Sequence, residues 1–290
     1  MNNKKILIFG FGYTANFLAQ KLKNTGFTIT GTSRNSEKRE YYSGFSYEIV
    51  DFTKPEVEKI IQDTTHILIS TSQRLSDFDP VLENFTEIIL NNTKKLEWIG
   101  YLSTTGVYGN HQGAWVDEET PVKPDGERTR KRIEAEQKWL EFGKNLNIPT
   151  NIFRLAGIYG EGRSVIEQLK EGKAQAIYKQ NQVFSRIHVE DIANILIASI
   201  NKPQGSNQGG NIYNVCDDEP APAYEVMNYA AEILGLPKPE IIPYEKAHLS
   251  DMAKEFYSSN RRVSNKKIKE KLGVDLLYPT YREGIKAIIR

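Results

Sequence analysis

The chain has 290 residues, 39% of them hydrophobic and 10% aromatic, which is enough for the core of one large or two moderate domains. Its 38 Lys and Arg residues balance 37 Asp and Glu residues, so bulk charge gives no reason to bind nucleic acid or an anionic membrane. The single cysteine, Cys216, excludes an internal disulfide framework and a multi-cysteine zinc site. No apolar run has the length of a membrane span, and the four histidines lack metal-ligand spacing. We therefore expect a cytoplasmic globular protein without a metal site.

Short apolar runs alternate with longer amphipathic segments over the first 110 residues. This alternation is typical of βαβ units and a mostly parallel sheet. The rhythm weakens beyond about residue 155, where prolines interrupt the chain often. We expect strands at 6–9, 27–30, 47–50, 66–70, 98–102, 150–155 and 212–215, and helices at 13–24, 56–62, 81–91, 223–234 and 282–289.

A glycine turn follows the first expected strand with the pattern G-x-G-x-x-A over residues 10–15. Gly10 permits a tight turn, Gly12 lets the backbone approach a pyrophosphate, and Ala15 is small enough for close helix–strand packing. The N–H groups at the start of the next helix, around Tyr13 and Thr14, would then hold the phosphates. This context predicts a dinucleotide site, and a plain tight turn is the alternative.

The end of the second strand distinguishes NAD from NADP. An acidic residue there would bind the ribose 2′-hydroxyl of NAD, but this chain has Ser33 and Arg34. The Arg34 guanidinium suits a 2′-phosphate, with the Ser33 hydroxyl beside it, so we predict NADP, with NAD as the other candidate. The alternative is a solvated loop arginine, since Lys38 and Arg39 follow closely.

Three further positions complete the predicted cofactor site. Asp51 follows the third expected strand, where its carboxylate would meet the adenine amino group or, with Thr53, cap a helix. Ser70 and Thr71 lie at the end of the fourth expected strand, and we include both among the cofactor-binding residues.

Together with later motifs, these residues resemble the extended short-chain dehydrogenase/reductase superfamily, the group of NAD(P)-dependent sugar-nucleotide epimerases and dehydratases. The resemblance covers nearly the whole chain and implies an α/β fold, with a Rossmann-type doubly wound parallel sheet at 1–155 and a smaller C-terminal α/β substrate lobe at 156–290, the two interleaved. Besides the glycine turn, the motifs are LSTTGVYG at 102–109, WVDEETP at 115–121, FRLAGIYGEGR at 153–163, RIHVEDIA at 186–193 and YNV at 213–215.

One family feature is absent. The resemblance implies a Tyr-x-x-x-Lys pair on a helix, expected here over 124–136, yet Arg128 and Arg132 stand in its place, or Glu127 and Lys131 if the register shifts by one. A guanidinium stays protonated near neutrality and is a poor general acid or base. Arg128 and Arg132 share a helix face, which suits an anion, and a solvated charged helix is the alternative.

The resemblance also implies a Ser or Thr hydroxyl that acts together with the Tyr-x-x-x-Lys pair, and this sequence retains such a residue. Thr104 falls where the family places its Ser or Thr near the nicotinamide, with Ser103 and Thr105 beside it, although a strand-end threonine can also simply cap a turn. Tyr108 is the most plausible alternative phenol, followed by Tyr159.

These features predict an atypical NAD(P)-dependent oxidoreductase or epimerase/dehydratase-like enzyme. It would act by hydride transfer on a nucleotide-sugar or a small carbonyl or alcohol, as a monomer or homodimer. The alternative is a catalytically inactive sensor that binds NADP(H).

Overall fold

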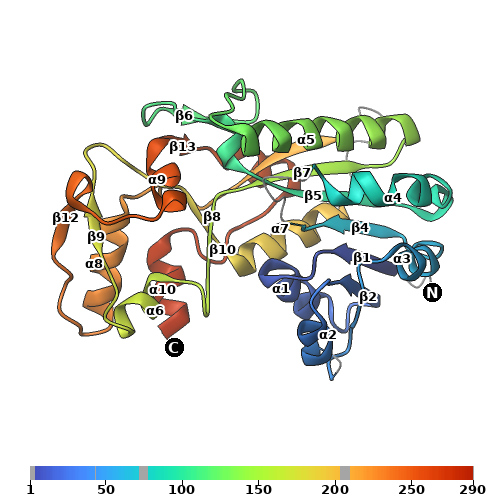
Figure 1. Cartoon of the computed structure of the whole chain (residues 1–290), viewed down its shortest axis with the longest axis horizontal. Coiled ribbons are helices and arrows are strands. Elements are labelled where there is room, and N and C mark those ends of the chain that lie inside the picture. Colours follow the sequence, from blue (N-terminus) through green and yellow to red (C-terminus); the bar gives the residue numbers. More distant parts are fainter. Residues whose placement is uncertain (1–3, 43, 72–77, 203–209, 290) are drawn as a thin grey trace. The chain divides into compact units, whose positions relative to one another are not determined.

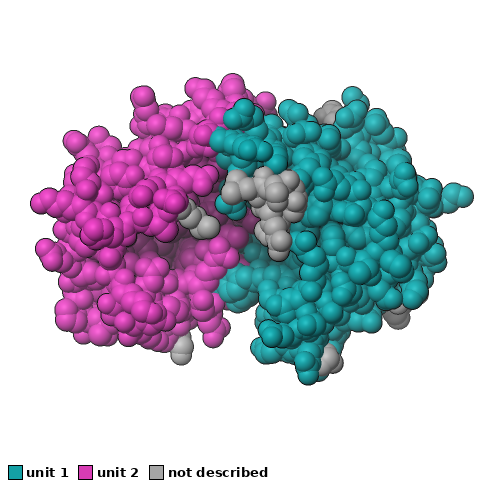
Figure 2. Space-filling view, in the orientation of Figure 1, with its two compact units in different colours: residues 1–104, 126–154, 192–213 teal, residues 105–125, 155–191, 214–290 magenta. Residues whose placement is uncertain are grey.

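The computed structural model describes residues 4–42, 44–71, 78–202 and 210–289 (Figure 1). The chain forms two compact units, which Figure 2 colours separately. Unit 1 consists of residues 1–104, 126–154 and 192–213, and unit 2 of residues 105–125, 155–191 and 214–290. Each unit is therefore assembled from three separate stretches of chain.

In the described part of the chain, seven strands form one sheet in the order β11-β7-β5-β4-β1-β2-β3. The pairings that run from β3 through β2, β1 and β4 to β5 are all parallel. This order is that of a doubly wound, Rossmann-type sheet, which confirms the predicted fold class. The strands are β1 (Lys4–Phe9), β2 (Phe27–Thr32), β3 (Glu48–Val50), β4 (His66–Ile69), β5 (Trp98–Thr104), β7 (Thr150–Leu155) and β11 (Asn211–Val215).

Helices cover both faces of this sheet (Figure 1). Alternate strand residues such as Leu7 and Phe9 pack in one cluster with Val57 of α3, Phe85 of α4 and Trp139 of α5. On the other face, the Trp98 indole N–H donates a hydrogen bond of 3.1 Å to Ser199 of α7. The helices are α1 (Tyr13–Leu22), α2 (Ser36–Tyr42), α3 (Lys54–Ile61), α4 (Pro80–Leu90), α5 (Glu127–Leu146) and α7 (Val189–Asn201).

Unit 2 contains three parallel two-stranded pairs and four α-helices in its described residues. Tyr281 and Ile285 of α10 pack with Val226 and Ala230 of α8 in its core. The pairs are β8 (Gly157–Tyr159) with β10 (Arg186–His188), β9 (Ala176–Tyr178) with β12 (Ile241–Pro243), and β6 (Trp115–Val116) with β13 (Arg262–Val263); the helices are α6 (Val165–Lys170), α8 (Ala223–Ile233), α9 (Asp251–Ser258) and α10 (Tyr281–Ile289).

Two absences concern the described residues only. Nowhere in them does a helix combine the length and hydropathy needed to traverse a bilayer. Within the same residues, no three His, Cys, Asp or Glu side chains gather as a metal site would require.

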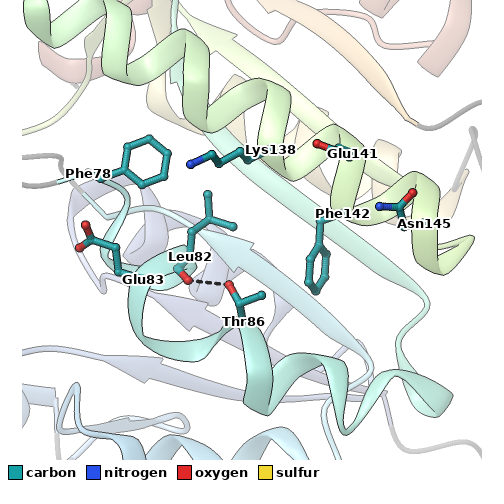
Figure 3. Close-up of a pocket in the computed structure, with 8 residues that line it drawn as sticks. All are labelled: Phe78, Leu82, Glu83, Thr86, Lys138, Glu141, Phe142 and Asn145. Atoms are coloured by element: carbon teal, nitrogen blue, oxygen red, sulfur yellow. Dashed lines mark hydrogen bonds between the residues drawn. The ribbon is translucent and has the colours of Figure 1, made fainter.

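A groove lies between α4 and α5 on unit 1. Phe78, Leu82 and Phe142 supply its apolar lining, and the Lys138 ammonium lies 4.2 Å from the centre of the Phe78 ring (Figure 3). Its volume is about 380 Å³. None of the residues that line it belongs to the predicted cofactor or catalytic set, so this hollow is separate from the candidate site.

A buried polar network fixes α5 on the sheet. Glu136 of α5 and Arg154 of β7 are 2% and 4% exposed, and Arg154 Nη2 lies 2.7 Å from Glu136 Oε2. The Ser103 hydroxyl of β5 donates to the other carboxylate oxygen. Because both oxygens of the buried carboxylate have partners, the network offsets the cost of removing the two charges from water.

We expect Glu136→Gln to lower the free energy of unfolding by about 3 kcal/mol, because it leaves the Arg154 guanidinium buried without a counter-charge. Urea unfolding measures the change. The matched control is Glu134→Gln, which removes an exposed carboxylate paired with Lys138 at 3.0 Å and should change stability by less than about 1 kcal/mol. Equal effects of the two substitutions would contradict the assigned role of the network.

Candidate functional site

The turn after β1 is bound directly to the end of β2. The Gly10 N–H donates to Thr32 Oγ1 at 3.1 Å, and the Phe11 N–H donates to the Thr32 carbonyl at 2.8 Å. Thr32 is fully buried, so its hydroxyl has a fixed place under the turn. These two hydrogen bonds determine where the chain leaves the sheet toward α1.

The neighbouring strands end at the same edge. The Ser33 N–H donates to the Val50 carbonyl at 2.9 Å, and the Ser70 N–H donates to the Phe9 carbonyl at 2.8 Å. Because carboxyl ends of parallel strands meet at one edge of a sheet, the residues that follow β1, β2, β3 and β4 form one row. The predicted cofactor residues within unit 1 all come from this row or from the first turn of α1.

The two glycines of the turn have different surroundings. Gly10 has φ +84°, and a Cβ atom there would lie 2.9 Å from Thr71 Cα. Gly12 has φ −117°, and a Cβ there would meet no described atom within 4 Å. Ala15 is fully buried, as close helix–strand packing requires. The fold therefore needs glycine at position 10, whereas Gly12 borders open space at the start of α1.

Two observations fit an anionic ligand in that space. In the described residues, no side chain caps the N-terminus of α1 at Gly12, and its first turn holds no acidic residue. The positive end of a helix dipole attracts anions at such a terminus. Thr71 Oγ1 is buried and has no hydrogen-bond partner among the residues described. Since burying an unsatisfied hydroxyl costs free energy, a ligand oxygen would satisfy it.

The ends of β2 and β3 carry two guanidinium groups. Arg34 is exposed, and its Cζ lies 5.8 Å from the centre of the Phe52 ring. Arg39 of α2 extends back, donating from Nη1 to the Ser33 carbonyl at 2.7 Å, with Nη2 3.0 Å from Asp51 Oδ2. Sequence reasoning treated Arg39 only as part of a basic surrounding and missed this contact. Asp51 pairs with Arg39, and Thr53 alone is the N-cap residue of α3.

The three hydroxyl residues at the end of β5 have different environments. The Ser103 hydroxyl donates to Glu136, and Thr105 is 6% exposed. Thr104 is the last residue of β5 and is half-buried. Of the three, Thr104 is the one whose side chain is both accessible and at the carboxyl edge of the strand.

Arg128 and Arg132 lie one turn apart on α5 but have different partners. Arg128 is exposed. Arg132 Nη1 donates to the Tyr101 hydroxyl at 2.9 Å and to the Leu102 carbonyl at 3.2 Å, and its Cζ lies 5.6 Å from the centre of the Tyr101 ring. Arg132 is thus bound to β5 and is half-buried, whereas Arg128 is exposed.

The two phenols suggested by the sequence are both enclosed within unit 2. Tyr108 is fully buried, and its hydroxyl donates to Asn214 Oδ1 at 2.8 Å. Tyr159 is 8% exposed and donates to the Thr280 carbonyl at 3.5 Å. Burial raises the pKa of Tyr159, and the nearby Asp217 and Asp191 carboxylates raise it further. Both phenols are therefore buried and hydrogen-bonded, and neither hydroxyl is presented to solvent.

Unit 2 has a pocket of its own. The rings of Phe184 and Phe256 stack there with centres 4.7 Å apart and planes at 12°. Arg261 also lines it, donating to the Gly109 carbonyl at 2.8 Å, and burial lowers the pKa of its guanidinium. The other residues that line the pocket are Thr105, Gly157, Val183, Ser185, Ser259 and Val263. Sequence reasoning did not find this set, because its members lie between positions 105 and 263 and share no motif.

The sequence profile of the NAD dependent epimerase/dehydratase family matches residues 6–216. The chain belongs to this family. A conserved protein of unknown function from Silicibacter pomeroyi DSS has a similar structure, with a TM-score of 0.88, 46% identity and 98% of both chains covered. Protein YeeZ of Escherichia coli K12 is 26% identical over 255 residues, 82% of this chain and 86% of that protein. A human epimerase family protein solved with NADPH shares the fold at a TM-score of 0.72 and 15% identity, with 98% of both chains covered.

The two glycines of this epimerase/dehydratase-family turn give a matched pair of substitutions. We expect Gly10→Ala to lower the free energy of unfolding by about 1–3 kcal/mol, because φ +84° and the Thr71 backbone both oppose a Cβ. Gly12→Ala should cost less than about 1 kcal/mol, since the added methyl meets open space. Chemical denaturation of both variants measures the difference, and a larger loss for Gly12→Ala would refute the described turn.

Proposed function

We propose that this chain is an atypical NADP(H)-dependent oxidoreductase that acts on a small or nucleotide-linked carbonyl or alcohol substrate. The observation that carries the proposal is the row at the carboxyl edge of the sheet, where the uncapped start of α1 and the buried Thr71 hydroxyl lie with the ends of β2 and β3. When bound there, the cofactor would supply the hydride chemistry. The backbone N–H groups at the start of α1 would hold its diphosphate, and Thr71 would donate to one of its oxygens.

The preference for NADP rests on charge at the end of β2. Ser33 and Arg34 follow this strand where an acidic residue would bind the 2′-hydroxyl of NAD. A guanidinium pairs with a phosphate through charge-assisted hydrogen bonds, and Arg34 is exposed and available for this contact.

Thr104 is the proposed catalytic residue. Its hydroxyl would donate a hydrogen bond to the substrate oxygen and so stabilise the charge that develops there. Arg128 stands where the family's phenol is expected and remains protonated, so it supplies positive charge to an anion but no transferable proton. The proton would then come from solvent, and we expect turnover to be slower than a phenol–lysine pair would allow.

The alternative function is an NADP(H) sensor without catalysis. One observation favours it: Tyr108 and Tyr159, the candidate replacement phenols, are both enclosed and hydrogen-bonded. Turnover distinguishes the two functions, because both require NADPH binding and only the enzyme oxidises it.

Arg34→Asp should weaken NADPH binding relative to NADH by about 1–3 kcal/mol, since a carboxylate would face the 2′-phosphate in place of a guanidinium. Calorimetric titration of both nucleotides into the unmutated and variant proteins measures this difference. The NADP assignment fails when the unmutated protein binds the two nucleotides with equal affinity.

For the enzyme, we expect NADPH oxidation with a panel of sugar nucleotides and small carbonyls. Thr104→Ala should lower kcat by about 100-fold or more, because the hydrogen bond to the reacting oxygen is lost. Thr104→Ser retains the hydroxyl and serves as the control, so it should keep most of the rate. Tight NADPH binding without oxidation by any substrate of the panel would instead support the sensor.

A further inference from the structure

The ion pair between Arg39 and Asp51 joins two strand ends of the candidate cofactor site. Arg39 belongs to α2, yet its guanidinium contacts Ser33, the first residue after β2, and Asp51, the first residue after β3. The two contacts are 2.7 Å from Nη1 to the Ser33 carbonyl and 3.0 Å from Nη2 to Asp51 Oδ2. The guanidinium therefore has a defined position at the carboxyl edge of the sheet.

Stability alone does not account for this pair. The side chains of Arg39 and Asp51 are 26% and 41% exposed, and ion pairs with this much solvent contact contribute little to folding. The guanidinium has five N–H donors in a planar fork, and its described contacts use one donor on each terminal nitrogen. Donors remain for a further acceptor at the same place.

We propose that Arg39 is a second specificity-determining cation for the 2′-phosphate of NADP(H), and that Asp51 is the positioning residue that holds it beside Ser33. This inference rests on the proposed function. A dinucleotide held at the glycine turn brings its adenosine ribose to the end of β2, the strand end that Arg39 contacts. Arg34 follows Ser33 directly in the chain, so two guanidinium groups would share the phosphate.

A positioning role for Asp51 and a purely electrostatic role predict opposite effects on NADPH binding. If it acted only through its charge, the carboxylate would repel a phosphate, and Asp51→Asn would strengthen NADPH binding. If it acts by positioning, the same substitution releases Arg39 and weakens NADPH binding, although the site becomes more positive. The sign of the effect therefore separates the two roles.

The test compares the ratio of the NADH and NADPH dissociation constants in full-length variants, measured by calorimetry. Arg39→Gln should reduce this ratio by about tenfold, and Asp51→Asn by about threefold or more. The double variant should be no worse than Arg39→Gln alone, because the second residue acts through the first. Lys38→Gln is the matched control, since it removes an exposed charge from the same helix, and it should change the ratio by less than about twofold.

Suppose that the unmutated protein prefers NADPH, as the proposed function requires. An unchanged ratio in Arg39→Gln would then overturn the inference, and so would a raised ratio in Asp51→Asn. Either result would leave the proposed function intact. A ratio near one in the unmutated protein would overturn the NADP assignment and this inference together. Thermal unfolding of each variant is the stability control. We expect unchanged midpoints, because both side chains are partly exposed and such ion pairs contribute little to folding, and an unchanged midpoint assigns the change in the ratio to binding.

Discussion

The candidate site depends on the two hydrogen bonds that tie the glycine turn to Thr32. They commit the Gly10 and Phe11 N–H groups to the end of β2, so that the chain turns sharply and starts α1 at the sheet edge. Gly10 is then close to the Thr71 backbone, where only a residue without Cβ fits. The uncapped helix start and the Thr71 hydroxyl come together as a consequence of this packing, and the strand ends that follow it complete the row.

Helix α5, where the resemblance implies a Tyr-x-x-x-Lys pair, is held on the sheet by two polar side chains. Arg132 binds the Tyr101 hydroxyl and the Leu102 carbonyl, and one turn later Glu136 binds Ser103 and Arg154. Arg132 is thereby directed to β5, and Glu136 to both β5 and β7. These contacts fix α5 on β5 and β7. Helix α5 contains no tyrosine, so it has no phenol for the proton transfer that the resemblance implies.

Local sequence signals were sufficient to predict the glycine turn, the strand–helix alternation and the parallel sheet, because each depends on neighbouring residues and on periodicity. Helix α2 has no buried side chain, so its sequence carries no apolar face that would indicate a helix, and it was not predicted. Helix α7 was not predicted either, although its apolar residues do follow a helical period. The helix expected at 13–24 ends at Leu22, and Asn24 already has a positive φ of 68°. The contacts of Arg39 with Asp51 and of Glu136 with Arg154 join positions 12 and 18 residues apart, and no local pattern indicates such partners.

The central claim is that backbone amides at the start of α1 and the Thr71 hydroxyl hold a dinucleotide diphosphate. Amide NMR of the deuterated, unmutated protein during titration with NADPH tests it most directly. The account predicts the largest shifts at Gly12, Tyr13, Thr14 and Thr71, which surround the proposed diphosphate position. Binding of NADPH with shifts confined to other parts of the chain, or no shift at saturating nucleotide, would contradict it.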